Sequence, residues 1–232
     1  MNFPGVGLAA LVIAVCLLTQ YRAAAQPVVA GSTRGLSGSL YIGYDRLHVD
    51  GPVAYGDVTY FDDDVRLSGG GLNVALAFGF GELVAVFAQA SGSRINAGRF
   101  DEAGLGHFDI GLRLYAPLPT AAVKPYAVVA RTGRALVIDD PLVVDFPESG
   151  SDAENVEAEF AGGGLSWGVG IHNFLRRDLA LNVQLVRTRG DFSRFDQRMS
   201  IDGDESEVEA ASIDQRARTT RLNFGLAWFF LR

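Results

Sequence analysis

The side chains best suited to chemistry in this sequence are charged and amide groups that stand between apolar residues in short alternating segments. They are Glu82, His107, Asp109, Arg113, Arg131, Asn182, Gln184 and Arg221. If these groups share an enclosed face, their charges must pair, because an isolated buried charge costs several kcal/mol. We expect Arg113 and Arg131 to share carboxylates such as those of Asp109 and Glu82. The pattern favours a salt-bridge network that plugs an interior, and a gated ion path is the alternative.

The spacing of the other reactive residue types gives little support for catalysis. The sequence holds three histidines, His48, His107 and His172, and none stands in a Ser-His-acid or His-x-Glu arrangement. Nucleophilic and metal-assisted hydrolysis both need such groups to be brought together. We therefore predict a protein that is not an enzyme and that has no cofactor and no metal site.

Two stretches of the sequence are strongly acidic. Their carboxylates are Asp139, Asp140, Asp145, Glu148, Asp152, Glu154 and Glu157 in the first stretch and Asp202, Asp204, Glu205, Glu207 and Glu209 in the second. Runs of like charge are usually solvated, so we expect surface loops in both places. Glycine runs at 69–71 and 162–164 precede strand-like segments, which indicates close backbone approach rather than phosphate binding.

Eight segments with alternating apolar and small or polar residues are available to position these side chains. They cover residues 36–45, 72–80, 83–93, 107–115, 126–133, 165–172, 179–185 and 221–230. Side chains of a strand alternate between its two faces, so each segment has one apolar face and one face of small, amide or charged residues. Alternation alone fits a soluble barrel with an apolar interior, and it fits a membrane barrel with an apolar exterior equally well.

Three features favour the membrane barrel. The second face consists mainly of glycine, alanine and serine with single charges, which suits a narrow interior. Short and long connections alternate, as periplasmic turns and external loops do. The short connections are near 81–82, 117–125 and 176–178, and the long ones are near 50–65, 94–104, 139–158 and 193–217. Aromatic residues near the short-turn ends are typical of an interfacial girdle. They are Phe78, Phe80, Tyr115, Tyr126, Phe174, Trp228 and Phe230.

One of the eight segments, the third, has ambiguous faces. Both of its faces are apolar, and we expect Val84, Val86 and Ala88 to point outward. In the fifth, Tyr126 and Arg131 fall on opposite faces, and we assign Arg131 to the interior.

The first 25 residues have the features of a cleaved secretory signal. An uncharged apolar run covers 8–18, and three alanines at 23–25 precede Gln26. A run of roughly 11 residues is too short to span a bilayer as a helix, although a retained membrane anchor is the alternative. Cleavage after Ala25 removes the single cysteine and Arg22, which takes the net charge from −7 to −8. We predict a signal peptide at 1–25, a periplasmic segment at 26–34 and a barrel at 35–232.

The composition agrees with this organisation. Hydrophobic residues make up 48% of the chain, the mean hydropathy is +0.16 and there are 28 glycines. Without cysteine in the mature chain, stability must come from a core or from the membrane. The acidic balance argues against nucleic acid as a partner, because that requires clustered lysine and arginine.

With these segments in place, the chain from Gly35 to Arg232 resembles the small outer membrane β-barrels typified by the transmembrane domain of outer membrane protein A and by the opacity-type surface proteins. The closing segment carries part of the resemblance through Phe224, Leu226, Trp228 and Phe230. In that family the last strand ends in an aromatic residue that the barrel assembly machinery recognises. Here Leu231 and Arg232 follow Phe230.

The prediction is an all-β protein, a closed antiparallel transmembrane β-barrel of about eight strands in up-and-down order. We expect a monomer in the bacterial outer membrane that serves envelope integrity or surface interaction. The alternative is a channel for small solutes or hydrophobic compounds. A lipid A-modifying enzyme, which the resemblance also admits, is less favoured because His172 stands beside Asn173 rather than a nucleophilic serine.

Several partners follow from this prediction. We expect outer membrane lipid, lipopolysaccharide and the barrel assembly machinery, together with a surface partner bound through the acidic loops. In one alternative, those carboxylates share divalent cations with lipopolysaccharide phosphates.

Overall fold

The computed structural model describes residues 31–230 apart from 52, 56–57, 62–63, 97–101, 119–121, 141–154 and 202–203. The predicted signal peptide, residues 26–30 and the centre of the third long connection therefore lie outside the described residues. So do Leu231 and Arg232. In the described ranges, no helix is long and apolar enough to cross a membrane.

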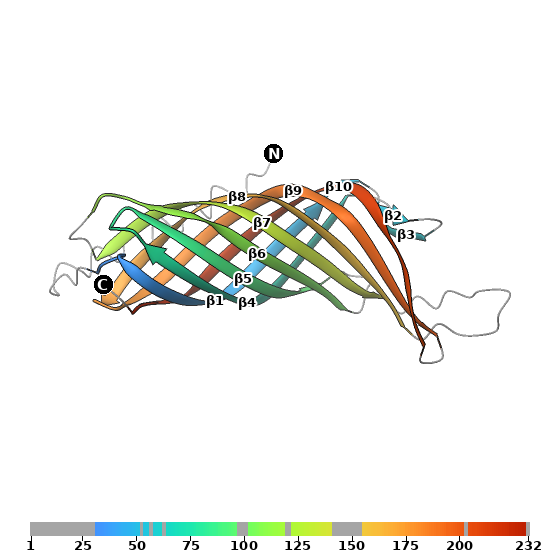
Figure 1. The fold of residues 1–232 in the computed structure, drawn as a ribbon, viewed down its shortest axis with the longest axis horizontal. Coiled ribbons are helices and arrows are strands. Elements are labelled where there is room, and N and C mark those ends of the chain that lie inside the picture. Colours follow the sequence, from blue (N-terminus) through green and yellow to red (C-terminus); the bar gives the residue numbers. More distant parts are fainter. Residues whose placement is uncertain are drawn as a thin grey trace.

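Eight of the strands in the described part form one closed antiparallel sheet in the order β1-β10-β9-β8-β7-β6-β5-β4. They are β1 (Gly35–Val49), β4 (Val65–Gly79), β5 (Val84–Asn96), β6 (Glu102–Tyr115), β7 (Val123–Asp140), β8 (Asn155–Arg176), β9 (Leu179–Ile201) and β10 (Asp204–Phe229). The strands β2 (Val53–Tyr55) and β3 (Val58–Phe61) form a separate hairpin. The last barrel strand pairs with the first, and the predicted closed barrel is confirmed (Figure 1).

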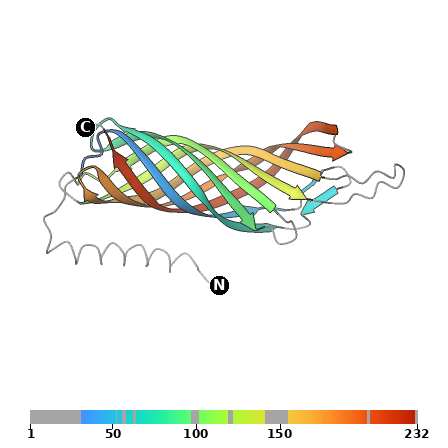
Figure 2. The same ribbon diagram turned by 90° about the horizontal axis from the view of Figure 1, so that it is seen from below.

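The register between strands sets the shape of the barrel. Paired residues followed around the barrel from Ser39 through Gln89, Thr132 and Gly190 return to β1 at Val49, ten residues further along the strand. Stagger of this kind requires strands tilted by about 35–45° to the barrel axis, and the tilt is visible in Figure 2. An eight-stranded barrel is only wide enough for side chains to fill its interior.

The two ends of the barrel differ. The end that carries the C-terminus also carries the short connections, whereas the β2–β3 hairpin lies at the opposite end (Figures 1 and 2). The strands β8, β9 and β10, which are 22, 23 and 26 residues long, extend furthest toward this opposite end. Pairing between β9 and β10 continues to Ile201 and Asp204, so the prediction of a loop at 193–217 is wrong. Backbone pairing does not need apolar side chains, so these strands continue where the alternation of apolar and polar residues has ended.

The faces of the ambiguous third segment follow from the burial of its side chains. On β5, Val84 and Val86 are exposed and Ala88 is half-buried, while Ala85 and Phe87 are buried, which confirms the expected faces.

On β7 the assignment is wrong. Arg131 is exposed on the outer wall, and Tyr126 and Thr132 face the lumen. Residues paired across a sheet share a face, and Arg131 pairs with exposed Ile110 and Leu165.

The aromatic residues near the short turns divide between the two faces. Phe78, Phe80, Trp228 and Phe230 are exposed on the outer wall, where a girdle is expected. The other three predicted girdle residues, which are Tyr115, Tyr126 and Phe174, are buried in the lumen. The prediction used only the distance from the strand end. These three residues alternate with the outward-facing residues of their strands, so they point into the lumen.

Candidate functional site

The outer wall carries a continuous apolar band around the middle of the barrel. Ile42, Leu72, Val169 and Phe224 are 69%, 63%, 58% and 54% exposed, and they come from four strands. A soluble protein does not leave such a surface in water. Only hydrocarbon accommodates a closed ring of exposed apolar side chains, and a barrel satisfies its backbone groups there because no strand edge is open.

The polarity of both faces reverses toward the end with the long connections. On β1 the outward side chains change from Ile42 and Tyr44 to Arg46, while the inward ones change from Asp45 to Leu47. The same reversal occurs on β9 and the neighbouring strands. The barrel therefore has a layer with an apolar outside and polar inside, followed by a layer with a charged outside and apolar inside.

A buried ion pair occupies the middle of the polar layer. The Nη1 atom of Arg221 lies 2.7 Å from Oδ2 of Asp109, and Nη2 donates a hydrogen bond to Oδ1 over 3.0 Å. Their side chains are 1% and 3% exposed. Two such contacts are the arrangement in which a buried pair compensates best for lost hydration.

Hydroxyl groups extend the polar layer from this pair. The Thr132 hydroxyl donates to Asp109, and further contacts link it to Ser166 and Ser166 to Thr188. An ionised carboxylate only accepts hydrogen bonds, so Ser166 must donate to Thr132 and Thr188 to Ser166. The chain of donors thus converges on one carboxylate and crosses four strands.

A second carboxylate, Asp45, is buried in this layer. It accepts a hydrogen bond from Ser93, and Nε2 of His107 lies 3.9 Å from its Oδ1. A further buried cation, Arg134, lies beside the apolar residues of the lumen. It donates to the carbonyl oxygen of Ala217 over 3.2 Å, and its guanidinium lies 4.7 Å from the centroid of the Phe192 ring, whose face stabilises a desolvated cation.

Arg113 lies closer to the short turns, in a cage of aromatic rings. Its Nη2 donates to the Tyr41 hydroxyl over 3.3 Å, and its guanidinium lies 4.8 Å from the Phe87 ring centroid and 5.6 Å from that of Tyr126. Ring faces stabilise a desolvated cation electrostatically. The expected sharing of carboxylates with Arg131 is wrong, because Asp109 pairs with Arg221 and Arg131 lies outside the lumen.

Amide side chains fill the space around this cage. Asn182 donates to Tyr41 over 2.9 Å and accepts from the Tyr126 hydroxyl over 2.7 Å. Its amide nitrogen also lies 2.7 Å from Nε2 of His172. Asn223 donates to Gln184 over 3.0 Å. All of these side chains are buried.

Glu82 lies at the short turn between β4 and β5, at one end of the barrel. It forms an ion pair with Lys124 and accepts hydrogen bonds from the Ser32 hydroxyl over 2.6 Å and the Thr33 amide over 3.3 Å. Burial raises the pKa of Glu82, but the hydrogen bonds from Lys124, Ser32 and Thr33 outweigh it and lower the pKa to about 2. The carboxylate therefore attaches residues that precede β1 to the end of the barrel.

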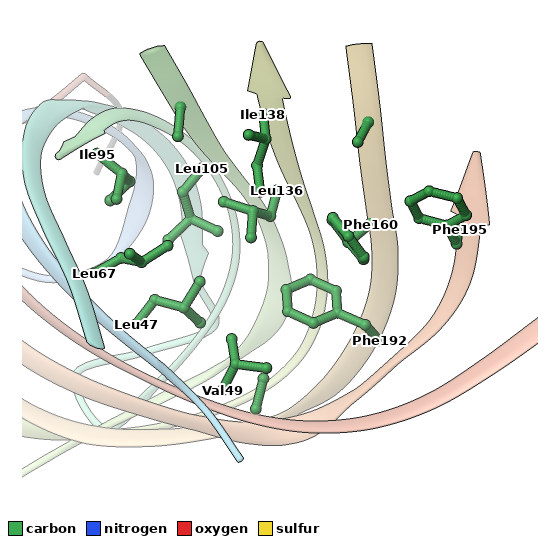
Figure 3. Close-up of a cluster of buried hydrophobic side chains, with 13 residues drawn as sticks. Leu47, Val49, Leu67, Ile95, Leu105, Leu136, Ile138, Phe160, Phe192 and Phe195 are labelled. Atoms are coloured by element: carbon green, nitrogen blue, oxygen red, sulfur yellow. The ribbon is translucent and has the colours of Figure 1, made fainter. Parts of the chain in front are cut away.

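At the opposite end an apolar cluster fills the lumen (Figure 3). Its members come from all eight barrel strands and include Leu47, Leu67, Leu136, Ile138 and Phe160, all 0–3% exposed. The outer wall at this level is charged, so the cluster is the core of a part of the barrel that extends into water. Burial of this set stabilises the extension by the hydrophobic effect.

The structure brings most of the predicted polar residues into the lumen, namely His107, Asp109, Arg113, Asn182, Gln184 and Arg221, and it places Glu82 at the lumen's end. The sequence prediction of lumen residues did not include Asp45, Arg134 and Lys124. The alternation of faces along their strands was a usable signal for placing them inside. In the described ranges, no group of three or more histidine, cysteine or acidic residues is arranged to hold a metal ion. Within the described part of the barrel, the side chains that fill both layers are buried.

The predicted assembly signal lies on β10 and, for Phe230, directly after it. Phe224, Trp228 and Phe230 are exposed on the outer wall, and Leu226 is half-buried. Recognition of this strand by the assembly machinery remains a prediction.

An apolar outer band, a closed strand order and a polar filled lumen define the class of outer membrane β-barrels. No protein family model matches the chain, and no curated protein sequence matches it. Among solved structures, the chain is similar to the outer membrane protein OprG from Pseudomonas aeruginosa, with 12% identity and a TM-score of 0.54 over 88% of this chain and 100% of that one.

Two further solved structures share the fold. One is the outer membrane protein AlkL in lipid bilayers, with 14% identity and a TM-score of 0.54 over 89% of this chain and 95% of that one. The other is a major outer membrane protein from Thermus thermophilus, with 13% identity and a TM-score of 0.51 over 83% of this chain and 99% of that one. At these identities the likeness concerns the fold.

Proposed function

We propose that this protein is a non-enzymatic bacterial outer membrane barrel with a closed lumen, which serves envelope integrity or surface interaction. The single observation that carries the proposal is the stacking of two filled layers in the lumen. The buried Asp109–Arg221 pair lies in one layer, and the apolar cluster around Leu136 covers it. An ion that followed the axis would have to break a buried ion pair and then cross an apolar plug.

The positions of the histidines support a non-enzymatic role. His107 and His172 are buried in the lumen at 4% and 1% exposure, out of reach of a substrate in solution or in the membrane. Catalytic groups need access to the reacting atoms. His48, at the rim, pairs with Asp50 over 2.9 Å and has no nucleophile among its described contacts.

Conductance measurements test the closed lumen. Mature protein refolded into a planar bilayer is expected to give no discrete openings, and Asp109→Ala combined with Arg221→Ala is expected to give brief openings because the ion pair is removed. Frequent openings of the unaltered protein would show a channel for small solutes and overturn the proposal.

One observation favours a second candidate, which is passage of small hydrophobic compounds. The cluster around Leu47, Leu136 and Phe160 offers an apolar environment inside the rim. A radiolabelled alkane added to proteoliposomes separates the candidates. Uptake above that of protein-free liposomes, lost when Leu136 is changed to Asp in barrels that still fold, would favour passage over a purely structural role.

A further inference from the structure

The outer wall of the barrel carries a concentration of arginines directly above the apolar band. On β9, β10 and β1 these are Arg46, Arg187, Arg189, Arg216 and Arg218, of which Arg218 is half-buried and the others are exposed. Carboxylates among the described residues balance them only in part. Arg218 pairs with Asp50, but Arg187 and Arg189 form no ion pair with another described residue.

The register places some of these charges in unfavourable proximity. Arg189 on β9 is directly opposite Arg218 on β10. Like charges at directly opposite positions destabilise a sheet. A bound anion between the strands removes that repulsion.

The wall is hollowed at this place. A cavity of about 380 Å³ is lined by the outward side chains of Asp50, Arg189, Asp191, Arg216 and Arg218, with Gly190 and Ala217 at its base. Three arginines therefore face one cavity with two carboxylates, one of which is already engaged by Arg218. The cavity keeps a net positive charge, and its guanidinium groups suit the bidentate recognition of phosphate.

The surface directly below the arginines is apolar. Arg187 pairs across the sheet with Trp167, and it follows Leu185 on the same face of β9. The Arg189 guanidinium lies 5.5 Å from the Trp167 ring centroid. Phosphate-binding groups thus stand at the border of a surface that contacts hydrocarbon chains, which is the arrangement that an anionic amphiphile fits.

We propose that this arginine site, Arg187, Arg189, Arg216 and Arg218, binds the phosphorylated headgroup of a glycolipid in the outer leaflet of the membrane. A further exposed arginine, Arg131, lies two strands away on β7, separated from Arg189 by Leu165. Strands are about 4.8 Å apart, so the basic row extends for about 10 Å beyond the cavity. One phosphate does not span that width, whereas a headgroup with two phosphates on a rigid sugar scaffold does.

The inference rests on the proposed outer membrane location, with the long-connection end outside the cell. The experiment uses mature protein folded in neutral detergent micelles, to which diphosphorylated lipid A is added. Fluorescence reports binding, because Trp167 lies next to Arg189 and the second tryptophan of the chain, Trp228, is near the opposite end of the barrel. Barrel formation is measured separately from binding, because a folded barrel migrates more slowly on gels after it has been boiled.

The test variant is Arg187→Gln combined with Arg189→Gln. The control variant, Arg176→Gln combined with Arg177→Gln, removes the same charge from exposed positions at the short-turn end. The test variant is expected to bind diphosphorylated lipid A at least about tenfold more weakly, since two charge-assisted contacts are lost. The control variant is expected to bind as the unaltered protein does.

Several outcomes would overturn the proposal. One is equal binding by the test variant and the unaltered protein in correctly formed barrels, and another is an equal loss in both variants, which would indicate unspecific charge attraction. A third is displacement of lipid A by millimolar inorganic phosphate, which would indicate a site for the free anion. Tight binding of dephosphorylated lipid A would likewise remove the role of the arginines. Failure of the barrel to shift on heating would instead contradict the proposed membrane location.

Discussion

Removing one partner of the Asp109–Arg221 pair is the most direct test of the filled lumen. In Arg221→Met, the Asp109 carboxylate loses contacts of 2.7 and 3.0 Å and keeps its hydrogen bond from Thr132. Each lost hydrogen bond to a charged group costs about 1.5–3 kcal/mol, and breaking a buried pair on one side costs about 3–5 kcal/mol. We therefore expect the free energy of unfolding to fall by about 3–5 kcal/mol.

A double-mutant cycle separates this effect from the general loss of packing. Asp109→Asn alone leaves the Arg221 charge without its carboxylate and is expected to cost a similar amount. The combination of Asp109→Asn with Arg221→Met leaves no unpaired charge at either position, so it should cost clearly less than the sum of the single changes. The measurement is equilibrium unfolding by urea in detergent micelles, followed by tryptophan fluorescence and checked by heat-dependent gel migration.

An exposed pair on the same barrel supplies the control. Arg194 lies 2.7 Å from Asp196, and its side chain is 62% exposed. Such a pair contributes about 0–1 kcal/mol, so Arg194→Met should unfold nearly as the unaltered protein does. If Arg221→Met also cost less than about 1 kcal/mol, or if the cycle showed no coupling, the lumen would have to be hydrated and the reasoning for a closed barrel would be refuted.

Three further predictions concern the layers and the short-turn end. Val183→Arg, on the apolar outer band, should destabilise the barrel by about 2–4 kcal/mol in bilayer unfolding measurements, and an effect near zero would place this face outside the hydrocarbon. Leu136→Ala should cost about 2–5 kcal/mol by opening a cavity in the apolar cluster, and a loss below about 1 kcal/mol in the same assay would mean that the cluster is not packed. The carboxylate of Glu82, whose pKa is lowered to about 2, favours the folded state above its ordinary pKa, so its contribution should disappear as the pH falls from about 4.5 to 2. In acid titrations of unfolding, Glu82→Gln should remove that part of the pH dependence, and an unchanged profile would contradict the role of Lys124 as its partner.

The reversal of polarity along the barrel explains why the lumen cluster is apolar. Residues such as Leu47 and Ile138 make the interior apolar at this level. The outward neighbours at the same level include Arg46 and Arg189, so this layer resembles a small soluble barrel above the membrane. Its core then has the ordinary task of holding long strands together in water.

The sequence alone determined the number of strands and most of the faces. Segments such as 179–185 alternate cleanly, and a period of two in eight stretches with alternating connection lengths leaves few folds to choose from. This is why Asp109, Asn182 and Arg221 were placed inside correctly. Where both faces of a segment have similar side chains, as around Arg131, the pattern has no preference between inside and outside.

The tertiary structure decided everything that depends on register. Sequence parity says on which face a side chain lies, but not how far along the barrel axis it lies relative to the other strands. That distance follows from backbone pairing around the closed sheet, where a stagger of ten residues on β1 accumulates over eight strands. It selected Arg221 rather than Arg113 as the partner of Asp109, continued β9 and β10 through an acidic stretch, and aligned arginines from separate strands above one apolar band. Only the closed sheet contains this information, because hydrogen bonds between distant segments fix it.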